Sequence, residues 1–234
     1  MHRLWIGFMP YAVVSLIHMV ALALDVDPVA GPTKLLLMPL LAGAVLWGGR
    51  GSRWGTTYTL LFTAMALSWL GDGAGSFFST APTVPMMLLF FGLAHLCYIW
   101  IFWRIIPIQR VPKWAMVYGL WWVVLVGVLV PVILGNVGGA PLAVAVTVYG
   151  ILLAGTAVAA SRCLPPVAVG GAFFLASDTI LAFRLFTPDA MPDWTSPLVM
   201  LTYCLGQGLI AAGVIIADRV EAAARDAEPV GGRA

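Results

Sequence analysis

The sequence predicts an all-α integral membrane protein, built as a bundle of eight transmembrane helices. Of its 234 residues, 62% are hydrophobic and only 9% are charged, whereas soluble domains carry about 25% charged residues. A water-soluble fold of this size could not hide so much apolar surface, because its exterior must face water. Lipid is therefore the expected solvent for most of the chain.

The spans follow from apolar runs of about 17–25 residues, the length of helix that crosses a bilayer. The first run is too long and continuous for a cleavable signal peptide, and further spans follow it. Residues 1–217 are predicted to form a single transmembrane domain, and residues 218–234 a polar cytoplasmic tail that is frayed or disordered. The predicted spans are 4–24, 33–48, 54–77, 84–103, 114–134, 140–160, 166–186 and 197–217.

Basic residues divide unequally between the two sides of this topology. Only Lys34 and Arg184 fall on the side opposite the N-terminus. An excess of Lys and Arg marks cytoplasmic loops, so both termini are predicted to be cytoplasmic and the location to be the cell's inner (plasma) membrane. The basic residues are scattered between apolar runs, which predicts no nucleic-acid binding. On the terminal side lie Arg3, Arg50, Arg53, Arg104, Arg110, Lys113, Arg162, Arg219, Arg225 and Arg233.

Two acidic residues fall inside predicted spans. Asp72 lies toward the end of the third span and Asp178 beyond the middle of the seventh. A carboxylate in the hydrocarbon region is costly unless it is paired, hydrated or protonated, and such residues usually mark function. The alternative is that the two acids only cap helix ends or hold helices together. Their shared depth favours a functional site between the middle and the outer half of the bilayer.

Further polar residues at similar depth predict a pocket rather than isolated contacts. His95 and Tyr98 are three residues apart and share one helix face, and Tyr203 and Gln207, four apart, share another. Each alone could be an interhelical hydrogen-bond partner, and a lysine at a span end could snorkel to the headgroups. The other candidates are Tyr149 in the sixth span and Lys34 at the outer end of the second.

Several kinds of site are excluded by what the sequence lacks. The three histidines lie too far apart for a zinc cluster, and no Gly-x-Ser-x-Gly, His-Glu-x-x-His or phosphate-loop motif is present. Neither a metal nor another cofactor is expected. The glycine-rich run 71–75 predicts a loosened or broken helix whose backbone lines a cavity.

Four short motifs follow one another along the chain: SWLGD (68–72), FFGLAHLCYI (90–99), SDTILA (177–182) and TYCLGQGLI (202–210). In this order they resemble the YhhN / lysoplasmalogenase family of multi-pass membrane proteins. The likeness begins at Thr33 and Lys34 and covers most of the chain. It implies an eight-helix hydrolase that cleaves the alkenyl (vinyl) ether bond of a lysoplasmalogen, releasing a fatty aldehyde and a glycerophospho-base.

The resemblance also implies roles for individual residues. The family's two aspartates match Asp72 and Asp178, which are therefore expected to be catalytic. The chain departs from the family at Gly75, where a leucine is usual, and this change bears on the geometry around the first aspartate and on the substrate head group. The residues expected to bind or orient the substrate are Lys34, His95, Tyr98, Tyr149, Tyr203 and Gln207.

Vinyl ether hydrolysis suits a pair of carboxyl groups. An acid protonates the β-carbon, water attacks the resulting oxocarbenium ion, and the hemiacetal collapses to aldehyde and alcohol. Burial beside a second carboxylate keeps one carboxyl group protonated near neutral pH. Asp72 and Asp178 are expected jointly to supply acid and base, with the order left open. Lys34 is expected to meet the phosphate.

Other functions fit the same polar residues. A proton-coupled transporter or a lipid-binding membrane protein would use the same pocket without changing its ligand chemically, and a purely structural subunit would not need so many intramembrane polar groups. Release of a cleaved product distinguishes the hydrolase from the first two. The expected partners are a lysophospholipid substrate and membrane lipid. The head group, the chain length, the leaflet and the oligomeric state stay open.

Overall fold

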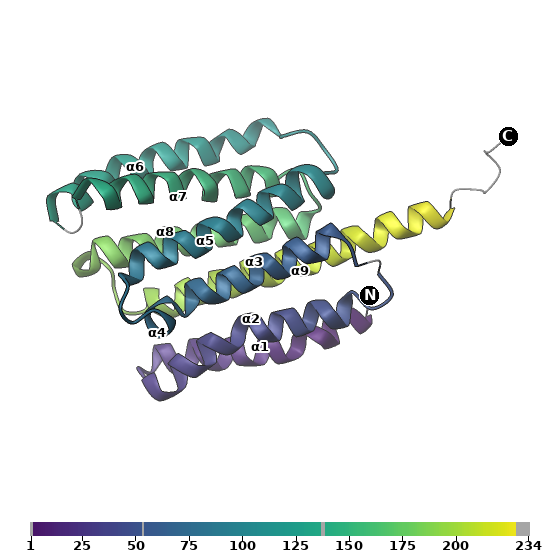
Figure 1. Ribbon diagram of the computed structural model, residues 1–234, viewed down its shortest axis with the longest axis horizontal. Coiled ribbons are helices and arrows are strands. Elements are labelled where there is room, and N and C mark those ends of the chain that lie inside the picture. Colours follow the sequence, from purple (N-terminus) through teal and green to yellow (C-terminus); the bar gives the residue numbers. More distant parts are fainter. Residues whose placement is uncertain (1, 53, 137–138, 228–234) are drawn as a thin grey trace.

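The computed structural model describes residues 2–52, 54–136 and 139–227, and within them the chain is helical with no strand. Figure 1 shows long helices stacked side by side. The α1–α2 and α6–α7 hairpins form the two outer layers, and α3, α5, α8 and α9 lie between them. The helices are α1 (His2–Ala23), α2 (Asp27–Gly48), α3 (Thr56–Asp72), α4 (Ala74–Phe77), α5 (Thr83–Trp100), α6 (Met116–Asn136), α7 (Gly139–Ala160), α8 (Pro165–Phe186) and α9 (Thr195–Ala227).

Seven helices of the described chain are long and apolar enough to cross a membrane, as in a multi-pass membrane protein. The remaining predicted span is shorter than expected, because α3 has 17 residues, about 25 Å at 1.5 Å per residue. Eight crossings therefore stay a prediction. The start of α1 and the end of α9 lie at the same end of the bundle (Figure 1), as an even number of crossings requires.

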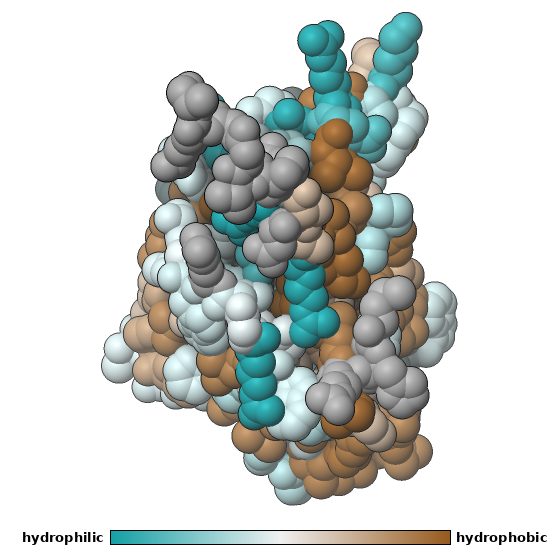
Figure 2. Space-filling model, turned by 90° about the vertical axis from the view of Figure 1, so that its right-hand side faces the viewer, coloured by the Kyte–Doolittle hydropathy of each residue, from teal (hydrophilic) through white to brown (hydrophobic). Residues whose placement is uncertain are grey.

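Figure 2 looks onto that end of the molecule. Hydrophilic side chains project from it, while hydrophobic residues cover much of the flanks. This distribution is the one expected where a bundle leaves the hydrocarbon layer for water. Which side of the membrane this end faces stays a prediction. Arg53 and Arg233, and the side chain of Arg3, lie outside the described residues.

Most helices agree with the predicted spans to within about two residues. The start of the second span was placed too late: α2 begins at Asp27 rather than at residue 33. An acidic residue in the first turn interacts favourably with the helix dipole, and Pro28 sits where the backbone N–H would lack an intrahelical partner. Residues 27–32, which were expected to lie in the loop between the first two spans, are therefore helical. Similarly, α5 continues as a π-helix, η1 (Ile101–Ile105).

The prediction of a frayed tail from residue 218 is wrong for its first part, because α9 continues to Ala227. This stretch is rich in alanine, the best helix former, and two contacts hold its beginning. Asp218 accepts a hydrogen bond from the Tyr58 hydroxyl at 3.1 Å, and Arg219 donates to the carbonyl of Gly48 at 2.5 Å. Residues 228–234 lie outside the described part of the chain.

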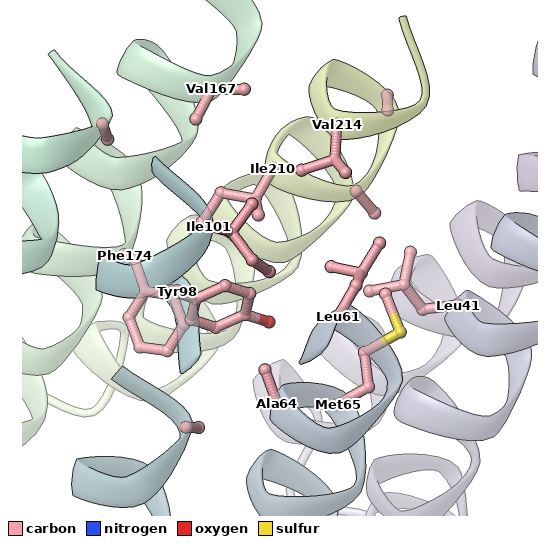
Figure 3. Packing of buried hydrophobic residues seen from close by; sticks show 14 of the residues in the cluster. Leu41, Leu61, Ala64, Met65, Tyr98, Ile101, Val167, Phe174, Ile210 and Val214 are labelled. Carbon is pink, nitrogen blue, oxygen red and sulfur yellow. The ribbon is translucent and has the colours of Figure 1, made fainter. Parts of the chain in front are cut away.

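A buried apolar core joins the central helices (Figure 3). Leu41 of α2 and Leu61 of α3 face Ile210 and Val214 of α9, and all four are fully buried. On the other side of this core α8 and α9 approach so closely that glycines are required. A Cβ on Gly170 would lie 2.9 Å from a backbone oxygen of α9, closer than side chains can pack. Small residues at such contacts let membrane helices associate through their backbones.

Replacing Gly206 in this contact with alanine is expected to destabilise the fold. Its Cβ would lie 2.9 Å from the backbone nitrogen of Phe174, and overpacking of this kind costs about 1–3 kcal/mol. Thermal unfolding of the purified protein in detergent measures the loss. Gly127→Ala on α6 is the matched control, because nothing lies within 4 Å of its added Cβ. Equal unfolding temperatures for the two variants would contradict the close α8–α9 contact.

Candidate active site

Asp72 is the last residue of α3, where the helix breaks as the glycine run predicts. Gly73 ends the helix, and its N–H bonds to the carbonyl of Trp69 at 3.0 Å. A Cβ at Gly73 would lie 2.2 Å from the Phe77 ring of the following short helix α4, so any larger residue here would require that ring to move. The break points the last carboxylate of α3 into the bundle, where its side chain is only 5% exposed.

The Asp72 carboxylate has two partners from other helices. The Tyr203 hydroxyl of α9 donates to Oδ2 at 2.7 Å. Lys34 Nζ of α2 lies 3.8 Å from Oδ1, longer than a hydrogen bond but close enough for strong attraction between the charges. The lysine is partly exposed, so one of its sides faces the carboxylate and the other is accessible. A cation and a hydroxyl donor together offset the free-energy cost of placing this carboxylate in the membrane interior.

Asp178 of α8 lies in a second cluster. The Tyr149 hydroxyl of α7 donates a hydrogen bond to Asp178 Oδ2, and His95 Nε2 of α5 lies 3.9 Å from the same oxygen. His95 Nε2 is also 3.3 Å from the Tyr149 oxygen. His95 is fully buried and Asp178 is about 10% exposed. Three helices thus bring an acid, a phenol and an imidazole into mutual contact.

His95 connects this cluster to a further hydroxyl group of α7. Its Nδ1 lies 3.0 Å from Thr156 Oγ1, and which of the two donates depends on the tautomer of the ring. When Thr156 donates to Nδ1, Nε2–H donates to the Tyr149 oxygen, whose own hydrogen goes to Asp178. A neutral ring in this tautomer therefore completes a chain of hydrogen bonds that ends at the carboxylate.

Tyr98 and Gln207 form a third group, one turn deeper than the first aspartate. The Tyr98 hydroxyl donates to Gln207 Oε1 at 2.6 Å, and Gln207 Nε2 donates to Ser68 Oγ at 3.2 Å. All three residues are fully buried. Figure 3 shows the Tyr98 ring beside Phe174 with its hydroxyl directed away from that ring. This group fixes α5, α9 and α3 relative to one another next to the site.

Aromatic rings fill the space between the two acidic clusters and contact both of them. Phe174 lies 5.6 Å from the Tyr203 ring and 4.8 Å from the His95 ring, between centroids, and Phe91 lies 6.1 Å from Tyr203. These ring contacts link Tyr203, which bonds Asp72, to His95, which lies beside Asp178. The structure therefore brings every predicted site residue into one region, while their catalytic and binding roles stay predictions.

Two contributors were missed from the sequence although their spacing could have revealed them. Ser68 precedes Asp72 by four residues, and Thr156 follows Tyr149 by seven, so each lies on the site-facing side of its helix. Both are hydroxyl residues, which are common inside membrane helices and carry little signal alone. Each bonds a residue of the site, Gln207 and His95 respectively.

A narrow cavity of about 50 Å³ lies beside Asp178 between α5, α6, α7 and α8. Its polar lining comes from Asp178 and Tyr149, and the other lining residues are apolar, among them Met87, Leu125 and Leu181. The space is enough for a few water molecules, and its apolar walls suit a hydrocarbon chain. Among the described residues no group of three His, Cys, Asp or Glu side chains is placed to hold a metal ion.

The fold and the site define a multi-pass membrane protein with paired acids and aromatic hydroxyls inside its bundle. The chain belongs to the YhhN family, whose model matches residues 30–214. This confirms the resemblance drawn from the motifs, and the matched region contains every predicted site residue. Neither a curated protein nor a solved structure matches the chain.

The hydrogen bonds of Gln207 give a stability prediction. Gln207→Leu leaves the buried Tyr98 hydroxyl without its acceptor, which should cost about 1–3 kcal/mol. Adding Tyr98→Phe removes that unsatisfied group, so the double variant should lose less than the sum of the two single variants. Thermal unfolding in detergent of the four proteins measures this coupling. Strictly additive losses would mean that the two side chains do not interact.

Proposed function

We propose that the protein is a lysoplasmalogenase-like hydrolase that cleaves the vinyl ether bond of a lysophospholipid. One observation carries the proposal: two aspartates from different helices, Asp72 and Asp178, lie in polar clusters on either side of the Phe174 ring, and the second lines an apolar cavity. Membership of the YhhN family supports it. The proposed products are a fatty aldehyde and a glycerophospho-base.

The cluster around Asp178 is suited to the first chemical step. In our mechanism a protonated Asp178, held by Tyr149, gives its proton to the β-carbon of the vinyl ether, and the double bond becomes an oxocarbenium ion. The cavity beside Asp178 would receive the reacting carbons at its polar end, since a space of about 50 Å³ is too small for the whole alkenyl chain. No other residue lining that cavity carries a charge.

Asp72 is suited to the step that follows. As a carboxylate beside Lys34, it would stabilise the oxocarbenium ion and take a proton from the attacking water. The hemiacetal then breaks at the carbon–oxygen bond to the glycerol unit. Protonated Asp72 would give its proton to the glycerol oxygen, and the hemiacetal hydroxyl would lose its proton to the ionised Asp178, so the aldehyde leaves and both acids return to their starting states. One water is consumed for each bond cleaved. Tyr203 would hold the carboxylate in position through its 2.7 Å hydrogen bond.

A carrier or lipid-binding protein is the other function that these polar groups fit. Such a protein also places acids inside a bundle, but it returns its ligand unchanged. The acidic cluster is enclosed by aromatic rings and opens on a cavity of only about 50 Å³. This confinement favours chemistry on one bond over passage of a whole lipid.

Neutralising either aspartate tests the reaction. Asp72→Asn and Asp178→Asn should each lower aldehyde release from lysoplasmalogen by at least about 100-fold, because general acid–base catalysis contributes 10²–10⁴-fold. Mass analysis of products from purified protein gives the rate, and thermal unfolding checks the fold. Asp25→Asn is the matched control, since Asp25 is exposed in the α1–α2 turn and asparagine tolerates its positive φ of 52°. Near wild-type turnover in both site variants would refute the mechanism.

Removing the two tyrosine hydroxyls tests how the acids are held. Tyr149→Phe and Tyr203→Phe each delete one hydrogen bond to a carboxylate, a bond worth about 1.5–3 kcal/mol when one partner is charged. If this energy acts in the transition state, kcat should fall about 10- to 100-fold. Tyr118→Phe, on α6 outside these clusters, should retain the wild-type kcat. Unchanged rates in both site variants would show that these hydroxyls do not support catalysis.

A further inference from the structure

A second cavity, of about 250 Å³, opens at the end of the bundle away from the termini, between α1, α2, α8 and α9. Its lining includes both basic residues of that end, Lys34 and Arg184, together with His18 and Ser196. Two cations on one cavity are unusual in a chain with so few charges. This arrangement is suited to an anionic group.

The basic side chains of this cavity are held in position by other residues. Arg184 is held in place because its Nη1 donates to Thr195 Oγ1 at 2.6 Å and to the Pro192 carbonyl at 3.2 Å. These bonds use one nitrogen of the guanidinium, which has five N–H donors. The other cation, Lys34, faces Asp72 on one side, so the cavity adjoins the proposed catalytic carboxylate.

His18 supplies an independent sign that the cavity takes a ligand. The residue is only 2% exposed, and its Nε2 is the one buried side-chain nitrogen or oxygen among the described residues that lacks a hydrogen-bond partner. Leaving such an atom unsatisfied costs about 1–3 kcal/mol. A buried polar atom of this kind on a cavity wall indicates a partner that comes from outside the chain.

The tautomer of His18 decides what that partner must offer. Its Nδ1 lies 3.0 Å from Thr33 Oγ1, and which of the two donates depends on the tautomer. A buried imidazole without a counter-charge is best kept neutral. Its Nε2 then accepts a hydrogen bond in one tautomer and donates one in the other. A hydroxyl group beside the anionic group of the ligand pairs with either form, because it can both donate and accept.

We infer that this cavity binds the glycerophosphate portion of the substrate. Lys34 and Arg184 contact the phosphate oxygens, and His18 Nε2 forms a hydrogen bond with the free glycerol hydroxyl of the lysolipid. Leu181 lines both this cavity and the one beside Asp178, so the two form neighbouring parts of one binding region. The inference rests on the proposed function for the identity of the lipid. It adds a reason for selecting lysolipids, since a second acyl chain would replace that hydroxyl group.

Binding of an uncleavable ligand tests the inference without any turnover. The probe is a radiolabelled 1-alkyl ether lysophosphatidylethanolamine, and purified protein in detergent is titrated with it. Removing the phosphate, to give the alkylglycerol, should weaken binding to the wild type about tenfold or more, because charge-assisted hydrogen bonds are lost. Arg184→Gln should weaken binding of the phosphorylated lipid but not of the alkylglycerol. Arg110→Gln, an exposed arginine in the loop before α6, is the matched control and should bind both as the wild type does.

A methyl group on the glycerol hydroxyl tests the contribution of His18. The methylated lipid should bind the wild type about fivefold more weakly, since one hydrogen bond is lost. In His18→Phe the two lipids should bind equally. An alkylglycerol that binds the wild type as tightly as the phospholipid, or a methyl effect of the same size in both proteins, would overturn the inference. Protein that binds as expected yet releases no aldehyde would overturn the hydrolase alone.

Discussion

Two carboxyl groups inside an apolar bundle set the constraint on which the rest of the site depends. A charge there is tolerated only when other groups of the protein pair with it or donate hydrogen bonds to it. Each aspartate accepts a hydrogen bond from a tyrosine of another helix. The bond from Tyr203 to Asp72 joins α9 to α3, and the bond from Tyr149 to Asp178 joins α7 to α8. The close glycine contact at Gly206 joins α8 to α9, so the helix that carries Asp178 packs directly against the helix that holds Asp72.

The charged and aromatic members of this site could be predicted from the sequence because such polar residues are rare inside membrane helices unless they have a role. The hydroxyl residues Ser68 and Thr156, and the partner that each side chain meets, could not. His95 and Tyr98 share a helix face by spacing, yet His95 bonds toward α7 and Tyr98 toward Gln207 of α9. Which neighbour a side chain meets depends on how far each helix is rotated about its own axis, and hydropathy does not report that angle. His18, remote from the other histidines in sequence, joins Lys34 on one cavity only through the packing of α1 on α2.

The predictions of two helix boundaries were wrong for a related reason. Hydropathy measures which residues prefer lipid, whereas a helix continues for as long as its backbone hydrogen bonds and propensities allow. At Asp27 the helix begins before the apolar run does, because an acid and a proline form a good first turn. Beyond Asp218 the helix outlasts the apolar run, because the alanine-rich polar sequence stays helical. The break after Asp72 was predictable, since glycines on both sides of an acid weaken a helix whatever surrounds it.

The division of charge between the two cavities favours a hydrolase over a carrier. The cavity beside Asp178 is apolar apart from that residue and Tyr149, whereas the cavity between α1, α2, α8 and α9 carries Lys34 and Arg184. A lysolipid divides in the same way, because its phosphate is charged and its alkenyl carbons are apolar. A lipid bound across both cavities would have its phosphate held by cations and its reacting bond near the acids. A carrier gains nothing from acids placed at one bond of its ligand, because that bond does not change during transport.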